Sequence, residues 1–340
     1  MPNYAKWLLK LGLTLAILLV ILVKADFRQI FATLALVAPL AVLVALVLAF
    51  LQVGVSAARL SLVVALYQRW LPFWDSLRVT LESAFFSQTF VSFFGGDALR
   101  IWRIRRCGLP LNQAASAVVL DRLIGVTVNH IFLLAALPWL LAEISDHALR
   151  IGLIALASAG VAGFALMLFL GACYGGEHGV APLPSQLRST NITRLLRDVA
   201  TVGRHFLHPG AKLLMAAAAS LVVVVINSLI FFVLLLGWKV PIGPAFGCAL
   251  LIPAVMEIAM LPISIAGWGV REGMAIIAFA GFGVASSVAL GSSLVFGLIV
   301  LAVGLVGGLL WLVDHREIGT LAAIEVEVAA SKDAAAAPNA

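Results

Sequence analysis

The sequence is poor in charged residues and has no long polar stretch that would form a water-soluble domain. Only 11% of its 340 residues are Asp, Glu, Lys or Arg, against about 25% in soluble domains. Apolar residues make up 63% of the chain, and its mean hydropathy is +1.12. This composition predicts a membrane protein throughout. The formal net charge of +6 is spread over short segments between apolar runs, so we expect no nucleic-acid partner.

The sequence also lacks the motifs of common catalytic and metal-binding sites. Its three cysteines, Cys107, Cys173 and Cys248, do not have the spacing of metal ligands. We interpret them as reduced packing residues. The chain contains no nucleotide-binding P-loop, no G-x-S-x-G nucleophile elbow and no H-E-x-x-H zinc motif. We therefore expect no metal and no other cofactor, and no ATP-driven pumping by this chain alone.

Six apolar segments are long enough to cross a membrane, which takes about 20 residues in a helix. They are Trp7–Val23, Ile30–Leu51 (which can continue toward Leu66), Ala114–Leu141, Leu149–Cys173, Lys212–Gly237 and Val288–Val313. The first has the outline of a signal peptide. We expect it to remain as an uncleaved helix, because many further spans follow it and no exported domain does.

Two other apolar segments, Leu77–Gly96 and Ala245–Phe282, contain polar residues. If the amino terminus is cytoplasmic and Leu77–Gly96 crosses fully, the next four arginines lie outside, against the positive-inside rule. A segment that dips in and returns keeps them inside; they are Arg100, Arg103, Arg105 and Arg106. By the same rule, Ala245–Phe282 dips in from the opposite side. We therefore predict an all-α transmembrane bundle with six full spans and two re-entrant hairpins, both termini being cytoplasmic. An inverted repeat, common in transport folds, remains open.

This reading divides the chain into two parts. Residues 1–317 form the transmembrane domain, which includes a basic cytoplasmic loop at 174–211. Within that loop, Asn191–Phe206 is either a basic helix on the membrane surface or a solvated connector. Residues 318–340 form an Ala-rich cytoplasmic tail that we expect to be disordered.

A short polar passage with paired glycines interrupts each of the two dipping segments. The first contains Gly95, Gly96, Asp97 and Arg100, and the second contains Gly267, Gly269, Arg271 and Glu272. Charges at membrane depth are costly and usually face a cavity. Glycines there favour broken helices, and a helix that begins at such a break offers its amino end to phosphate. We predict that Asp97 is an N-cap, sharing a helix face with Arg100, and that the arginines add phosphate-binding forks. The alternative is internal ion pairs without a ligand.

Five further charged residues lie within apolar sequence, and two of them, Arg59 and Glu82, are noted only as charges near membrane depth. Asp121 and Arg122 sit early in a long apolar helix, where Arg122, Gly125 and Asn129 form a stripe at helical spacing. We expect this stripe to face the interior, with Arg122 paired to Asp97; the alternative is that both charges snorkel to the cytoplasmic interface.

Glu257 is the last of these charges. It lies between Pro253 and Pro262, in a segment that cannot be one straight helix. A desolvated carboxylate there would take up a proton readily, so we hypothesise that Glu257 couples movement to protons. We interpret His130, which follows Asn129 in the sequence, as a packed histidine rather than a ligand.

These passages resemble the lysylphosphatidylglycerol synthase transmembrane-region family, also described as flippase-like integral membrane proteins. The matching pieces are Phe94–Arg100, Ala117–Gly125, Leu261–Gly273 and the Gly304–Trp311 helix with its Gly307-Gly308. In order and spacing they cover roughly residues 7–315 of the chain. The positions that match the family's functional residues are Gly95, Gly96, Asp97, Arg100, Asp121, Arg122, Gly267, Gly269, Arg271 and Glu272.

The resemblance implies a membrane domain that moves a lipid between leaflets. In bifunctional relatives, this domain flips lysyl-phosphatidylglycerol made by a soluble aminoacyl-transferase domain. That domain is not part of this sequence, so we expect no synthesis of aminoacyl lipid. Stand-alone relatives serve varied lipids, among them isoprenoid-linked sugars and hopanoids.

We therefore predict a flippase-like protein of the bacterial plasma (inner) membrane that translocates a phospholipid or an isoprenoid-linked lipid. Arg100 and Arg271 hold the head-group phosphate, while Asp97, Asp121 and Glu272 orient the arginines or hold a cationic head group. One alternative is a membrane-embedded transferase, or an accessory subunit, acting on a polyprenyl-phosphate lipid. Another is an anchor for a separately encoded soluble lipid-modifying enzyme.

Overall fold

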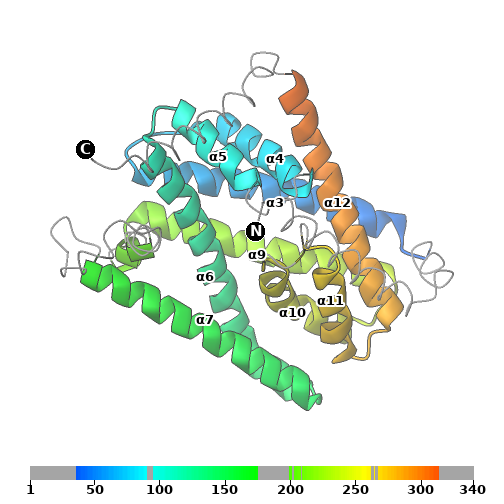
Figure 1. The fold of residues 1–340 in the computed structure, drawn as a ribbon. Coiled ribbons are helices and arrows are strands. Elements are labelled where there is room, and N and C mark those ends of the chain that lie inside the picture. The colour runs from blue at the N-terminus through cyan, green and yellow to red at the C-terminus, as the bar shows by residue number, and fades with distance from the viewer. Residues whose placement is uncertain are drawn as a thin grey trace, which may run out of the picture.

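The computed structural model describes residues 36–89, 95–174, 199–200, 203–207, 209–261, 264 and 267–313. Every regular element in this part of the chain is a helix (Figure 1). The helices are α3 (Pro39–Leu66), α4 (Phe73–Thr89), α5 (Gly95–Arg106), α6 (Leu111–Glu143), α7 (His147–Tyr174), α9 (Ala211–Gly237), α10 (Ile242–Ala259), α11 (Val270–Ala280) and α12 (Ser286–Val313). The expected span Trp7–Val23, most of Asn191–Phe206 and the tail at 318–340 lie outside the described residues.

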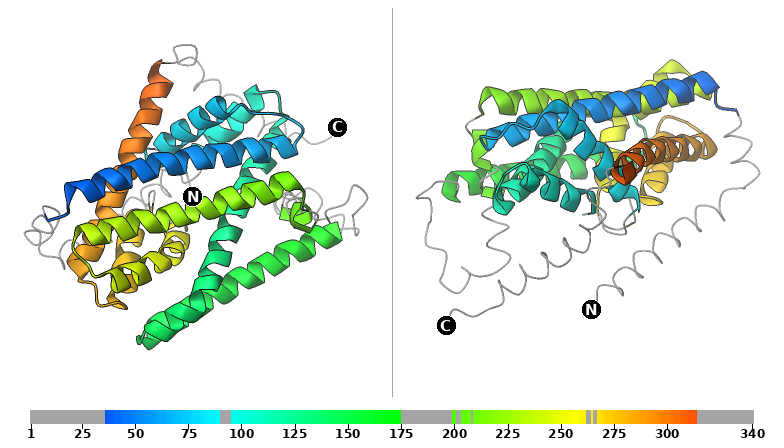
Figure 2. Two further views of the ribbon diagram at one scale, coloured as in Figure 1. Left: turned by 180° about the vertical axis from the view of Figure 1, so that it is seen from behind. Right: turned by 90° about the horizontal axis from the view of Figure 1, so that it is seen from above.

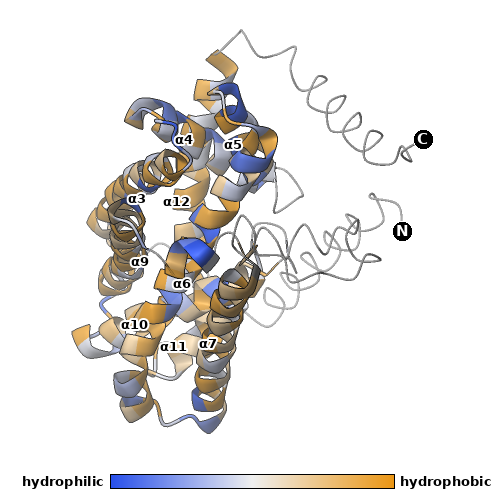
Figure 3. Cartoon of the chain, turned by 90° about the vertical axis from the view of Figure 1, so that its left-hand side faces the viewer, coloured by the Kyte–Doolittle hydropathy of each residue, from blue (hydrophilic) through white to orange (hydrophobic). Residues whose placement is uncertain are grey.

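Six of these helices are long and apolar enough to cross a membrane: α3, α6, α7, α9, α10 and α12. The chain is thus a multi-pass membrane protein. Five of the six correspond to predicted spans. The sixth is the 18-residue helix α10, which the sequence analysis placed in the second re-entrant hairpin. Figure 3 shows hydrophobic residues along the outer surfaces of α3 and α9, and hydrophilic residues gathered on α4 and α5.

Two long helices, α3 and α9, form an antiparallel frame and lie side by side (Figure 2). At one end, the backbone N–H of Ala38 donates to the carbonyl of Gly237 at 3.1 Å. At the other end, Nζ of Lys212 donates to the carbonyl of Ala65 at 3.0 Å. We refer to these as the Gly237 end and the Ala65 end of the bundle.

The helix pair α4–α5 is a hairpin that enters and leaves at the Ala65 end. It connects the end of α3 to the start of α6, and Asp121 near the start of α6 pairs with Arg59 near the end of α3. At 1.5 Å per residue, the 12 residues of α5 rise only about 18 Å, less than the thickness of a bilayer core of about 30 Å. The α4–α5 hairpin therefore has the arrangement predicted for the first re-entrant hairpin, with both of its ends at one end of the bundle.

The bounds of this first hairpin differ from the prediction, which ended it at Gly96. Its second arm, α5, extends through the arginine run to Arg106. An acidic residue in the first turn, Asp97, and arginines in the last turn suit the helix dipole, which supports the helix that the sequence analysis expected to begin at Asp97.

The helix pair α10–α11 is the second hairpin and it opens at the Gly237 end. It connects the end of α9 to the start of α12. Trp139 near the end of α6 packs edge-on against Phe246 near the start of α10, with ring centroids 5.5 Å apart. The 11 residues of α11 rise only about 16 Å, which is too short to cross. The two hairpins therefore enter the bundle from opposite ends, as predicted. The inverted repeat itself stays a prediction.

Helix α12 packs along the first hairpin as well as following the second. Gly307 lies so close to α4 that a Cβ atom there would collide with the backbone carbonyl of Leu81. Nearby, the rings of Phe86 and Trp311 pack edge-on with centroids 5.4 Å apart. In the first half of α12, the ring of Phe296 packs 4.9 Å from the ring of Phe231 on α9. Helix α12 thereby packs against both the first hairpin and the frame helix α9.

Candidate functional site

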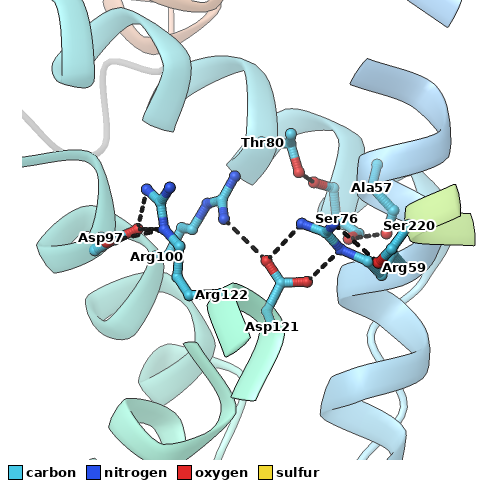
Figure 4. Close-up of polar contacts among 9 residues, drawn as sticks. All are labelled: Ala57, Arg59, Ser76, Thr80, Asp97, Arg100, Asp121, Arg122 and Ser220. Carbon is cyan, nitrogen blue, oxygen red and sulfur yellow. Dashed lines mark hydrogen bonds and ion pairs between the residues drawn. The ribbon is translucent and has the colours of Figure 1, made fainter. Parts of the chain in front are cut away.

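Asp121 is the centre of a buried charge network between α3, α5 and α6 (Figure 4). Its side chain is 1% exposed, and Arg59 donates to both of its oxygens at 2.7 and 3.1 Å. Nη1 of Arg100 adds a third contact at 3.2 Å. Arg59 also donates to the hydroxyl of Ser220 on α9 at 3.1 Å. One carboxylate thus ties four helices together and holds two guanidinium groups in a fixed place.

Asp97 pairs with Arg122, as the sequence analysis expected. Nη2 of Arg122 donates to Oδ1 of Asp97 at 2.9 Å, and Nε lies 3.2 Å from both carboxylate oxygens. The expectation that Asp97 caps its helix was wrong, because α5 begins two residues earlier at Gly95. Its carboxylate serves an ion pair from the first helical turn instead, which still suits the helix dipole.

Gly96 allows the two arms of the first hairpin to approach each other. A Cβ atom at this position would collide with Oγ of Ser87 and lie 2.6 Å from the backbone carbonyl of Ser83. Any larger residue would push α5 away from α4. Since α5 carries Arg100, this close approach sets where that guanidinium lies.

Arg271 and Glu272 form a second buried network at the start of α11. Glu272 is fully buried and accepts from Nη2 of Arg271 at 2.7 Å and from the backbone N–H of Gly269 at 2.6 Å. The hydroxyl of Ser293 on α12 lies 3.0 Å from both side chains. The Arg271 guanidinium also lies 5.1 Å from the ring centroid of Trp268. Glu272 thus holds the N–H edge of the guanidinium, and Trp268 covers one of its faces.

The two glycines of this second passage make the turn that precedes α11. Gly267 has φ of 78° and Gly269 has φ of 84°, values that residues with a Cβ atom rarely adopt. The turn lets the chain reverse direction and presents the Gly269 N–H to Glu272. The structure therefore confirms the expected chain break and helix start, and adds the reason for two glycines.

The arginines of both hairpins line one central cavity of about 370 Å³. Arg100 comes from the first hairpin, Arg271 from the second, and Arg122 from α6 between them. Among the described lining residues none is acidic, and the other polar ones carry amide or hydroxyl groups: Gln52, Ser56, Thr80, Ser83, Ser87, Gln88 and Asn227. Two buried polar atoms of the lining, Nε of Arg100 and Oδ1 of Asn227, have no hydrogen-bond partner within the described structure. The cavity is thus basic and offers unused hydrogen-bonding capacity.

Glu257 lies outside this cavity lining, in a network with α6. Its Oε1 accepts from Nδ2 of Asn129 at 2.9 Å and lies 2.8 Å from Nδ1 of His130. Nε2 of His130 faces the backbone carbonyls of Leu156 and Ala157 on α7 at 3.2 and 3.3 Å. Carbonyl oxygens only accept, so Nε2 carries a hydrogen. The Nδ1–Oε1 contact then holds one proton, on either the histidine or the carboxylate.

The stripe on α6 faces the interior, as predicted. Arg122 reaches Asp97, Gly125 leaves room for the guanidinium of Arg59, and Asn129 reaches Glu257. His130 is more than the packed residue that the sequence analysis assumed, because it bridges α10 to α7. The signal for this role was the pair Asn129-His130 inside an apolar helix.

Arg59 and Glu82 were recognised in the sequence only as charges near membrane depth. Arg59 is the main partner of Asp121. Glu82 on α4 is fully buried and binds Arg78 at 2.9 Å and Arg103 at 2.8 Å. The available signal was a charged residue within an apolar stretch, but Asp121 lies 62 positions from Arg59 and Arg103 lies 21 positions from Glu82.

Together these features define a class of protein: a polytopic helical membrane protein in which two re-entrant hairpins enclose a cavity lined by arginines. In the described part of the chain, no group of His, Cys, Asp and Glu side chains is arranged to hold a metal ion.

The chain belongs to the family described as the lysylphosphatidylglycerol synthase TM region, whose model matches residues 7–308. This membership indicates a lipid-related function in the membrane. No curated protein matches the chain.

Proposed function

We propose that this protein moves a lipid with a phosphate-containing head group between the leaflets of a bacterial inner membrane. The observation that carries the proposal is that Arg100, Arg122 and Arg271, from both hairpins and the helix between them, line one cavity. The head group occupies this cavity while the acyl or isoprenoid chains stay in the bilayer. The hairpins enter from opposite ends of the bundle, so one wall of the site comes from a hairpin inserted from one leaflet and the opposite wall from a hairpin inserted from the other. Transporters commonly bind substrate at such broken helices near the midplane.

The charges support an anionic head group. Four arginines, Arg59, Arg100, Arg122 and Arg271, meet three carboxylates in the two networks. The carboxylates are those of Asp97, Asp121 and Glu272, and each is already engaged by at least one guanidinium. One positive charge is left over among these side chains. A phosphate diester would neutralise it, and guanidinium forks match phosphate oxygens.

The same reasoning disfavours a cationic head group for this chain. A lysylated phosphatidylglycerol carries two amino groups and one phosphate, and those amino groups would need carboxylates facing the cavity. The three acidic residues serve to orient the arginines instead. This supports the first of the two roles that the sequence analysis assigned to them.

Arg100→Gln is the most direct test. Asp121 keeps both bonds from Arg59 in this variant, so the cavity loses a cation while the ion-pair network survives. Full-length protein reconstituted in vesicles should move a fluorescent phosphatidylglycerol between leaflets, as measured by dithionite quenching. The rate of lipid movement should fall at least about tenfold in the variant. This factor corresponds to the loss of one charge-assisted hydrogen bond of about 1.5 kcal/mol.

Arg105→Gln is the matched control. Arg105 lies on the same helix and is exposed, and it does not line the cavity. Its activity should equal that of the unmodified chain. Equal activity of Arg100→Gln and Arg105→Gln would refute the assignment of the cavity. If neither the unmodified chain nor the control moves lipid, while labelled polyprenyl phosphate is converted to product, the protein is the transferase considered above.

A further inference from the structure

A second arginine cluster lies at the open end of the first hairpin, apart from the central cavity. Arg78 and Arg103 both bind the buried carboxylate of Glu82. Together with Arg106 they line a cleft of about 210 Å³ between α4 and α5, which also contains Asp75. Three arginines thus face two carboxylates, which leaves an excess of positive charge.

An apolar groove of about 550 Å³ runs beside this cleft, between α4 and α12. Its α4 side is formed by Trp74, Leu77, Arg78 and Leu81, and its α12 side by Val306, Leu309, Leu310 and Val313. Arg78 lines both the groove and the cleft. A ligand with an anionic group and a hydrocarbon chain could therefore place the anionic group in the cleft and the chain in the groove. Arg78 would contact it where the two spaces meet.

Two exposed tryptophans near the start of α4 indicate that this end of the hairpin, with its cleft, lies at the membrane surface. Trp70 and Trp74 are 70% and 75% exposed, and exposed tryptophans are typical of the head-group region of membranes. The groove residues Leu309 and Val313 are 63% and 76% exposed, which is expected of side chains that face lipid. The cleft thus lies at head-group level, and the groove lies at the level of the acyl chains.

We propose that the cleft and the groove together bind one anionic phospholipid from the leaflet at the Ala65 end. The phosphate contacts Arg78 and Arg106, and one acyl chain lies along the groove between α4 and α12. Charge complementarity selects the anionic lipid, since the cleft has excess positive charge. The apolar groove favours a membrane lipid over free phosphate, because free phosphate would occupy the cleft and leave the groove empty. This site is separate from the translocation cavity and does not depend on it.

The test uses Trp74 as a reporter of the groove. Full-length protein is reconstituted in vesicles that contain either phosphatidylglycerol or phosphatidylcholine with brominated acyl chains, which quench tryptophan fluorescence on contact. Subtracting the signal of a Trp74→Phe variant isolates the contribution of Trp74. We expect brominated phosphatidylglycerol to quench Trp74 at lower mole fraction than brominated phosphatidylcholine does.

Arg78→Gln should lower this preference about fivefold, the weight of one cationic side chain near an anionic membrane surface. Glu82 keeps both of its bonds from Arg103 in that variant, so the hairpin stays folded. Arg105→Gln, which removes an exposed arginine outside the cleft, should leave the preference unchanged. Val306→Phe, which fills the groove without touching the arginines, should reduce quenching by both lipids.

Three results would overturn the proposal. They are equal quenching of Trp74 by the two lipids in the unmodified chain, equal loss in Arg78→Gln and Arg105→Gln, and full quenching in Val306→Phe. Retained helicity and a single elution peak serve as folding checks for each variant. Since no lipid movement is measured, the result is independent of the proposed function.

Discussion

The network around Asp121 makes a prediction about the order in which three substitutions destabilise the protein. Asp121 is 1% exposed and lies between Arg59 and Arg100. Asp121→Asn leaves two buried guanidinium groups without the carboxylate that neutralises them. Removing one partner of a buried ion pair costs about 3–5 kcal/mol, so this variant should be the least stable.

Arg100→Gln should be the mildest of the three. It removes one 3.2 Å contact, and Asp121 keeps a partner that donates to both of its oxygens. The loss of one hydrogen bond to a charged group amounts to about 1.5 kcal/mol. Arg59→Gln should lie between the two, because it removes both of those bonds and the contact with Ser220, but leaves Arg100 in place.

The assay is titration of the full-length protein in mixed micelles with SDS, following the loss of helicity to obtain the free energy of unfolding. The expected order of cost is Asp121→Asn, then Arg59→Gln, then Arg100→Gln. If Arg100→Gln costs as much as Asp121→Asn, then Arg100 is part of the scaffold. In that case, lost lipid movement in the variant would report misfolding, and Arg100 would no longer be assigned to the head group.

The remaining predictions concern packing, Glu257 and Cys107. Gly96→Ala should lower the free energy of unfolding by about 1–3 kcal/mol in the same titration, since its Cβ atom meets the Ser83 carbonyl. Gly54→Ala is the control: open space surrounds this position, so the change should be neutral or stabilising by up to about 1 kcal/mol. Equal effects of the two changes would contradict the packing of α4 against α5. Glu257→Leu leaves His130 Nδ1 without its carboxylate partner and leaves Asn129 with only the Pro253 carbonyl as acceptor, so it should cost about 1–3 kcal/mol. Glu257→Gln, which retains an acceptor, should cost less. Partial burial and the nearby Asp75 carboxylate raise the pKa of the Cys107 thiol above its ordinary value of 9.0, so less thiolate is present at a given pH. The rate of maleimide labelling of a Cys173→Ser, Cys248→Ser chain should therefore keep rising beyond pH 9.0. A rate that reaches a plateau below pH 9.0 would contradict this prediction.

The sequence was sufficient to predict the two hairpins, because the prediction rests on which side of the membrane the basic residues prefer. The arginines that follow Gly96 would have lain on the wrong side of the membrane if Leu77–Gly96 crossed it, and that constraint does not depend on local detail. The arm lengths were harder to predict. Helix α5 continues to Arg106 with charges that suit the helix dipole, whereas the apolar segment on which the prediction rested ends at Gly96.

The pairing of the charges could be predicted only in part. Arg122 was matched to Asp97 because its stripe on α6 had to face the interior. Asp97 and Arg100 share a face at helical spacing, yet each binds a residue of α6 rather than the other. The partners of Asp121 come from helices that cross it, and no spacing along one sequence shows which helices cross. Single-sequence patterns therefore find buried charges more readily than they find partners.

The arrangement of these charges also explains how arginines can be kept at membrane depth while some of their donors stay available. An unpaired guanidinium there is costly, so each cavity arginine is held by a carboxylate on the side away from the cavity. Arg100 spends one donor on Asp121, while its Nε, buried in the cavity wall, finds no partner in the described structure. A guanidinium has five donors and its carboxylate occupies only some of them, so the remainder stay available. The carboxylates thus lower the cost of the site without filling it, and an anionic head group from either leaflet would meet donors that are already in position.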